Sequence, residues 1–120
     1  YDPEEWEREG VDLRTGLEKF LSYTDGAVLV GHNIAFDWMH IKKSLEQCGL
    51  HFNYYYKGLD TFSLAWQKLA GQPNLTHMSL RELSKYFNLS EGRAHRAIDD
   101  ARTTYRVFLE LLKEPEHRAF

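Results

Sequence analysis

The stretch AVLVGHNIAFDWMHIKKSLEQCG, residues 27–49, decides the fold because an apolar run is followed directly by a run with helical spacing. Residues 27–31 are apolar, rich in branched side chains and end in glycine, which is typical of a strand covered on both faces. Residues 35–48 repeat apolar side chains at helical intervals, and Gly49 ends the pattern. A strand followed by a helix favours an α/β fold. The helix side chains available to a core are Phe36, Met39, Ile41 and Leu45.

The alternation of helices and strands continues on both sides of this stretch. Asp12 has the side chain of a helix cap, and the pattern after it predicts a helix to about Tyr23. Residues 52–60 predict a second strand. Asp60 or Thr61 then caps a helix that runs to about Leu69.

Two further helices are predicted toward the end of the chain. Ser79, followed three residues later by Glu82, forms the pattern of a capping box and opens a helix over residues 80–87. The closing helix is expected over residues 96–113, with Pro115 ending it. Its predicted apolar stripe consists of Ala101, Tyr105, Phe108, Leu109 and Leu112.

The sheet implied by this pattern needs more than the two predicted strands, because a two-stranded sheet is only marginally stable. The chain also starts at Tyr1 without an initiator methionine. We therefore expect an α/β domain that lacks its first strands. With 120 residues, 42% of them hydrophobic, the chain is expected to form one compact domain over residues 1–120, of which residues 1–11 are an acidic lead-in segment.

Composition excludes several classes of protein. No run approaches the roughly 18 apolar residues of a membrane span, so we expect a cytoplasmic protein without a membrane partner. The formal charge of −3 argues against nucleic-acid binding by bulk electrostatics alone. Charge is nevertheless segregated, because residues 93–106 carry four arginines against Asp99 and Asp100.

Two carboxylates and a histidine stand where the predicted strands and helices join. Asp37 follows the strand at residues 27–31, and Asp100 lies in the first turns of the closing helix. Carboxylates brought together repel unless a cation neutralises them, and hard divalent metals prefer oxygen ligands. His95 precedes Asp100 by five residues, at or before the helix start, where an imidazole can take a proton from a metal-held water. Taken singly, each of these residues reads more simply as a cap or an exposed polar side chain.

Two segments of the chain resemble motifs of the DEDDh 3'-5' exonucleases, the family of ribonuclease T and of the proofreading subunit of bacterial DNA polymerase III. VLVGHNIAFDWMHIKKSL, residues 28–45, is similar to the second motif of that family, and RAHRAIDDARTTYRVFLELL, residues 93–112, is similar to the third. The intervening segments LDTFSLAW and HMSLRELSKYFNL also resemble the family pattern. The resemblance covers residues 12–113 in the same order.

The resemblance implies a ribonuclease H-like α/β fold in which two Mg²⁺ or Mn²⁺ ions are held by acidic residues. By position, Asp37 and Asp100 would be metal ligands and His95 the general base that activates water. The ions would stabilise the attacking and leaving oxygens of a phosphodiester displacement. The substrate would be a nucleic acid with a single-stranded 3' end, DNA or RNA, and a homodimer or a polymerase-type protein would be the partner. His32, Asn33 and Phe36 would lie beside the site, with substrate contact and local packing equally weighted.

One family feature has no match in the chain. The first motif, an aspartate-x-glutamate on a strand, is absent, because the acidic pairs with that spacing follow no apolar run. Two of the four metal ligands of the family are therefore not supplied by these residues, and the chain is predicted to be inactive alone. Two alternatives remain open: an inactive exonuclease-like module that binds nucleic acid or protein, and an ordinary α/β interaction domain with a coincidental match.

Overall fold

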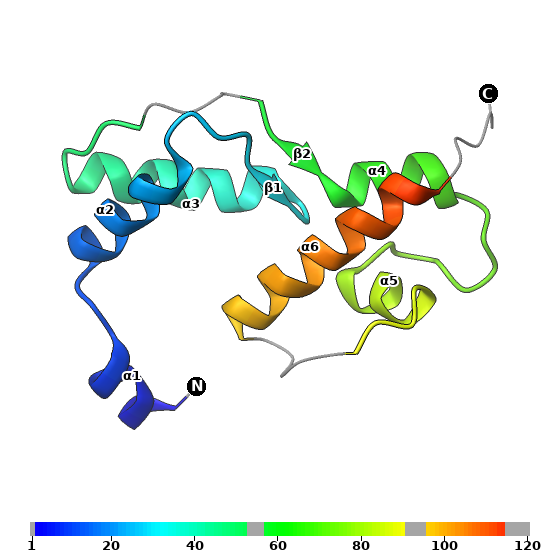
Figure 1. Cartoon of the computed structure of the whole chain (residues 1–120), viewed down its shortest axis with the longest axis horizontal. Helices are drawn as coiled ribbons and strands as arrows, with labels where there is room; N and C mark the ends of the chain where they lie inside the picture. Colours follow the sequence, from blue (N-terminus) through cyan, green and yellow to red (C-terminus); the bar gives the residue numbers. More distant parts are fainter. Residues whose placement is uncertain (1, 53–56, 91–95, 115–120) are drawn as a thin grey trace. The chain divides into compact units, whose positions relative to one another are not determined.

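The computed structural model describes residues 2–52, 57–90 and 96–114 of the chain (Figure 1). The chain divides into two compact units, and each is described here by itself. The first unit consists of residues 1–28 and 35–57, and the second of residues 29–34 and 58–120. The first strand and the turn after it thus belong to the second unit, together with residues 58–120.

The described part of the first unit contains the helices α1 (Pro3–Glu9), α2 (Leu13–Thr24) and, from its second residue on, α3 (Ile34–Gln47). Asp12 caps α2 as predicted, because its carboxylate accepts hydrogen bonds from both the backbone N–H and the hydroxyl of Thr15. The Arg14 guanidinium then donates to the carbonyl of Cys48 at 2.8 Å. This bond ties the start of α2 to the turn that follows α3.

The second unit contains a sheet of two short parallel strands, β1 (Val30–Gly31) and β2 (Leu59–Asp60). Val30 pairs with Leu59, and Gly31 with Asp60. The predicted strands at residues 27–31 and 52–60 are therefore in the right places but too long, although residues 53–56 lie outside the described part. The prediction that both faces are covered is wrong for Val30, which is 37% exposed, and Leu59 is 42% exposed.

The core of the second unit lies among α4 (Thr61–Leu69), α5 (Leu80–Tyr86) and α6 (Ala97–Lys113). α6 packs against α4, α5 and β1, and Figure 1 shows it as the orange and red helix beside α4 and α5. The buried side chains come from all three helices and from the loop between α4 and α5. They are Ala65, Leu69, Leu75, Met78, Leu83, Val107 and Leu111.

The predicted apolar stripe of α6 is not the buried one. The helix buries Thr104, Val107 and Leu111. It leaves most of the predicted stripe exposed: Ala101, Tyr105 at 62%, Leu109 at 39% and Leu112 at 58%, with Phe108 half-buried. α6 has two apolar faces, and helical periodicity alone cannot tell which of them meets a neighbouring helix.

A similar correction applies to α3. Leu45 is buried as predicted, whereas Phe36 and Met39 are 58% and 57% exposed. The helix itself was predicted correctly, and it ends before Gly49, which has a backbone φ of +62° that favours glycine.

The predicted helix ends are confirmed, with one difference at α5. The Ser79 hydroxyl accepts from the backbone N–H of Glu82, as in a capping box. The Glu82 carboxylate does not return this bond to Ser79. It accepts instead from the Thr76 hydroxyl at 2.9 Å and from the backbone N–H of His77 at 3.0 Å. Glu82 therefore fixes the loop that leads into α5.

Lys68 joins the ends of α4 and α6. Its ammonium donates at 2.8 Å to the carbonyls of both Leu111 and Glu114, two acceptors left over at the end of α6. Within the described part of the chain, none of the helices combines the length and the apolar character that crossing a membrane requires.

Neighbouring leucines on α6 provide a direct test of this packing. Leu111 is fully buried and Leu112 is 58% exposed. Leu111→Ala should lower the free energy of unfolding by about 2–5 kcal/mol, because it leaves a cavity in the core. Leu112→Ala should change it by no more than about 0.5 kcal/mol. Urea denaturation of both variants measures the difference, and equal losses would contradict the assignment of the buried face.

Candidate functional site

The carboxyl ends of β1 and β2 lie next to each other because the two strands are parallel and Gly31 pairs with Asp60. The turn from β1 into α3 therefore runs beside the start of α4. In α/β folds, side chains at this edge of a sheet are the ones that gather at binding sites. His32 and Asn33 follow β1, and Thr61 follows β2.

Asp60 joins these two segments through one carboxylate oxygen. Its Oδ1 accepts from the backbone N–H of Phe62 at 2.9 Å and thereby caps α4. The same atom accepts from the backbone N–H of Asn33 at 2.9 Å. Asn33 has a φ of +61°, a left-handed conformation that asparagine tolerates better than most residues. The side chain of Asn33 is exposed at this turn.

The His32 ring is fixed within the second unit. Its Nδ1 lies 2.8 Å from the Thr61 hydroxyl, which is fully buried and also lies 3.3 Å from the Gly31 carbonyl oxygen. Burial lowers the pKa of His32 below the ordinary value of 6.5. The Asp60 carboxylate and a backbone hydrogen bond with Met78 oppose this shift and raise the pKa, but burial has the larger effect.

A row of aromatic rings continues from His32 along α4. The Phe62 ring meets the His32 ring edge to face, with centroids 6.1 Å apart, and stacks on Trp66 at 6.4 Å. Trp66 is 54% exposed. Trp38 is half-buried and its ring packs near Phe52, while Tyr54, Tyr55 and Tyr56 lie outside the described residues.

Asp37 lies in the first turn of α3, in the first unit. It is exposed, as is Phe36, whose ring packs edge-on against His40 with centroids 4.6 Å apart. A carboxylate in the first turn of a helix is favoured by the helix dipole. The position therefore suits Asp37 with or without a metal.

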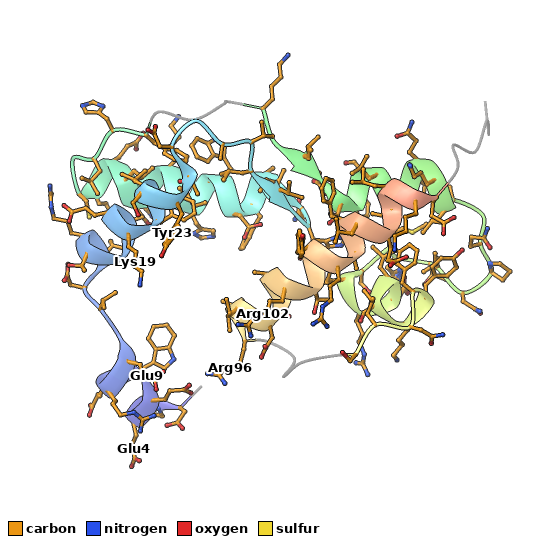
Figure 2. All side chains as sticks on the ribbon, viewed as in Figure 1. Glu4, Glu9, Lys19, Tyr23, Arg96 and Arg102 are labelled. Carbon is orange, nitrogen blue, oxygen red and sulfur yellow. The ribbon has the colours of Figure 1, made fainter. Side chains whose placement is uncertain are left out.

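Asp99 and Asp100 lie in the first turn of α6, in the second unit. The two differ in their surroundings. Asp99 has a side chain only 20% exposed and an Oδ1 that lies 3.9 Å from Arg102, whereas Asp100 is exposed. Figure 2 shows Arg96 and Arg102 as the labelled side chains at this end of α6. The amino end of α6 thus combines carboxylates with arginines.

The structure brings only some of the predicted site residues together. His32 and Asn33 share one edge of the sheet with Asp60 and Thr61. Asp37 and Asp100 belong to different units, and His95 lies outside the described residues. Over residues 2–52, 57–90 and 96–114, no three His, Cys, Asp or Glu side chains are grouped so that they could hold a metal ion. The assignments of His95, Asp37 and Asp100 remain predictions.

Sequence reasoning missed the link between Asp60 and Asn33. The sequence offers Asp60 or Thr61 as the cap of α4, and the structure shows that the cap is Asp60. The second bond of Asp60 cannot be predicted locally, because it depends on the pairing of β1 with β2. The available signal was the order of the residues, since a cap that follows one parallel strand lies beside the turn that follows its neighbour.

Comparison with known proteins gives a family match over most of the chain. The model of the RNase T family, described as exonuclease, matches residues 5–108. A PolC-type DNA polymerase III of Caldanaerobacter subterraneus subsp. tengcongensis is 34% identical over 98 residues, 82% of this chain and 7% of the polymerase. The 3'-5' exonuclease DinG of Staphylococcus saprophyticus is 38% identical over 93 residues, 77% of this chain and 10% of that protein.

A third relative is closer in size. The DNA polymerase III subunit epsilon of Aquifex aeolicus is 32% identical over 100 residues, which are 82% of this chain and 46% of the subunit. The chain thus spans less than half the length of each of these three relatives.

The lowered pKa of His32 predicts a pH dependence of stability. Below pH 6.5 the unfolded chain binds a proton at this histidine more readily than the folded chain does, so protonation favours unfolding. The free energy of unfolding should therefore fall as the pH drops from 6.5 toward the folded-state pKa of His32. His32→Gln should remove this component of the slope in urea denaturation at a series of pH values.

The exposed His51 provides the control for that measurement. His51→Gln should leave the His32 component in place. A slope that survives unchanged in His32→Gln would show that the ring is not held in its neutral form by burial.

Proposed function

Because the chain belongs to the RNase T exonuclease family, we propose that it forms part of a metal-dependent 3'-5' exonuclease. The observation that supports this most directly is the family match over residues 5–108, which spans the segments of Asp37 and of His95 with Asp100. The proposed reaction is hydrolysis of the terminal phosphodiester bond at a single-stranded 3' end. Since the relatives are named as DNA polymerase III components and a DinG exonuclease, we propose DNA as the substrate.

Asp37 and Asp100 are the proposed metal ligands. Each is an exposed residue in the first turn of a helix. Oxygen ligands suit Mg²⁺ and Mn²⁺. Two such ions, when bound, would stabilise charge on the attacking and leaving oxygens of the displacement. Asp99, which lies close to Arg102, is proposed to support this end of α6 without holding a metal.

His95 is the proposed general base. It stands five residues before Asp100 in the sequence, just ahead of α6. A histidine there is suited to take a proton from the attacking water near neutral pH. His32 is a poorer candidate for this role, because its ring already lies against the Thr61 hydroxyl and burial lowers its pKa.

Asn33 and Phe36 are the proposed substrate contacts. Both are exposed: Asn33 lies in the turn from β1 into α3, and Phe36 lies in the first turn of α3. The amide of Asn33 can donate and accept hydrogen bonds, and the ring of Phe36 offers an apolar surface on which a base can stack. A second copy of the chain or a polymerase-type protein is the proposed partner. The exposed apolar side chains Tyr105, Leu109 and Leu112 of α6 form a surface suited to protein contact.

An inactive exonuclease-like module remains the second candidate function. It is favoured by one specific observation, the lack of an aspartate-x-glutamate pair after an apolar run in these 120 residues. Such a module would bind nucleic acid through the arginines near the start of α6 and would not hydrolyse it.

The 120-residue chain alone should show no exonuclease turnover with Mg²⁺ or Mn²⁺, because Asp37 and Asp100 supply two of the four carboxylates that the family uses. The measurement is release of mononucleotides from a single-stranded oligonucleotide labelled at its 5' end. The full-length gene product should be active in the same assay. Turnover by the isolated chain would overturn the proposed ligand count, and an inactive full-length protein would favour the binding module.

Asp100→Asn should abolish turnover in the full-length gene product, because it removes a ligand charge with little change in shape. Asp99→Asn is the matched control on the same helix turn and should retain most of the rate. Circular dichroism should show the same helix content in both variants. Equal losses of activity would refute the assignment of Asp100 as the ligand.

His95→Ala should lower the rate by about 10² to 10⁴, the usual contribution of positioned proton transfer. The wild-type rate should rise with pH through the ordinary titration range of histidine, about 6 to 7, and that rise should disappear in the variant. Metal affinity, measured by calorimetry, should persist. An unchanged pH profile in His95→Ala would exclude this histidine as the base.

A further inference from the structure

We infer that Asp60 is a positioning residue of the proposed nuclease site, a role that rests on the proposed function. Asp60 acts through the backbone of Asn33 and does not itself touch substrate. The inference starts from geometry: one oxygen, Oδ1, accepts at 2.9 Å from the N–H groups of both Phe62 and Asn33. A helix cap needs only the first of these bonds.

The second bond controls an unfavourable backbone conformation. Asn33 has a φ of +61°, and a residue other than glycine enters this region at some cost. The residue is exposed, so packing does not hold it there. The hydrogen bond from its N–H to a charged carboxylate is stronger than a bond to a neutral acceptor and selects this conformation.

Two more interactions hold the turn against the start of α4. The His32 Nδ1 lies 2.8 Å from the Thr61 hydroxyl, and this hydroxyl lies 3.3 Å from the Gly31 carbonyl oxygen. Residues 31, 32 and 33 are thus each tied to residue 60 or 61. Gly58 lets the two segments of the chain approach closely, because a Cβ atom there would stand 3.2 Å from the Ile34 side chain and 3.3 Å from the Leu29 carbonyl oxygen.

The fixed turn leads directly into α3, which begins at Ile34 and carries Asp37 in its first turn. Asn33 and Asp37 are the proposed substrate contact and metal ligand of this segment. A turn with a defined conformation gives α3 a defined first residue, and catalysis is sensitive to displacements of about 1 Å in the groups that position substrate. Asp60 therefore contributes to the rate without entering the reaction.

The test compares three variants of the full-length gene product. Asp60→Ala removes both bonds of the carboxylate. Asp60→Asn keeps an acceptor oxygen that can still cap α4 and bind the Asn33 N–H. Asp12→Ala is the matched control, because Asp12 caps α2 in the same manner and has no bond to the turn at Asn33.

Hydrogen exchange of the Asn33 amide measures the bond itself. In the wild-type protein and in Asp12→Ala this amide should be protected although Asn33 is exposed. In Asp60→Ala it should exchange at the rate of an open chain, and Asp60→Asn should restore protection. An Asn33 amide that exchanges freely in the wild-type protein would overturn the inference.

Exonuclease kinetics measure the positioning role. Asp60→Ala should lower kcat by about tenfold or more with little change in KM. Asp60→Asn and Asp12→Ala should stay near the wild-type kcat. An active wild-type protein in which Asp60→Ala and Asp12→Ala behave alike would overturn only the positioning role of Asp60. A full-length protein without metal-dependent activity would overturn the proposed function, and the positioning role with it, even if the Asn33 amide were protected.

Discussion

The parallel pairing of β1 with β2 is the constraint on which the arrangement of the second unit depends. Each strand has only two residues, so the ladder itself contributes few hydrogen bonds. The pairing matters through the parallel direction of the two strands, because parallel strands place both carboxyl ends at the same edge of the sheet. The turn that leads into α3 then lies beside the start of α4, and Asp60 accepts from the backbone N–H groups of Asn33 and Phe62. A short sheet is thereby reinforced by side chains at the point where its strands end.

Local chemistry made the order and the ends of the helices predictable. Asp12, Asp60 and Ser79 each cap the helix that the sequence assigned to them, because a cap depends on residues two or three positions apart. Glu82 shows the limit of such reasoning. The capping-box pattern correctly predicts the bond to Ser79, yet the Glu82 carboxylate binds Thr76 and His77, and those bonds hold its pKa below the ordinary value. The choice among several nearby hydrogen-bond donors depends on the conformation of the loop.

The buried faces could not be predicted for a different reason. α6 carries one apolar face that contains Val107 and Leu111 and another that contains Tyr105 and Leu112, and both have helical spacing. Only contact with α4 and α5 distinguishes the two. The same holds for Phe36 and Trp66, which are aromatic, regularly spaced and exposed. In the candidate site, the sequence identified His32 and Asn33, whereas their partners Asp60 and Thr61 emerged only from the strand pairing.

The environment of His32 separates two roles that the sequence left equally weighted. A substrate-binding histidine needs a ring nitrogen that faces the substrate and is free to exchange partners. His32 is instead half-buried, lies against the Thr61 hydroxyl, and has a pKa that burial lowers. These features favour a neutral ring that holds the end of β1 against the start of α4. Local packing is sufficient to account for these features, and substrate contact by His32 remains a prediction. Asn33, one residue further along, differs because its backbone is bound while its side chain remains exposed.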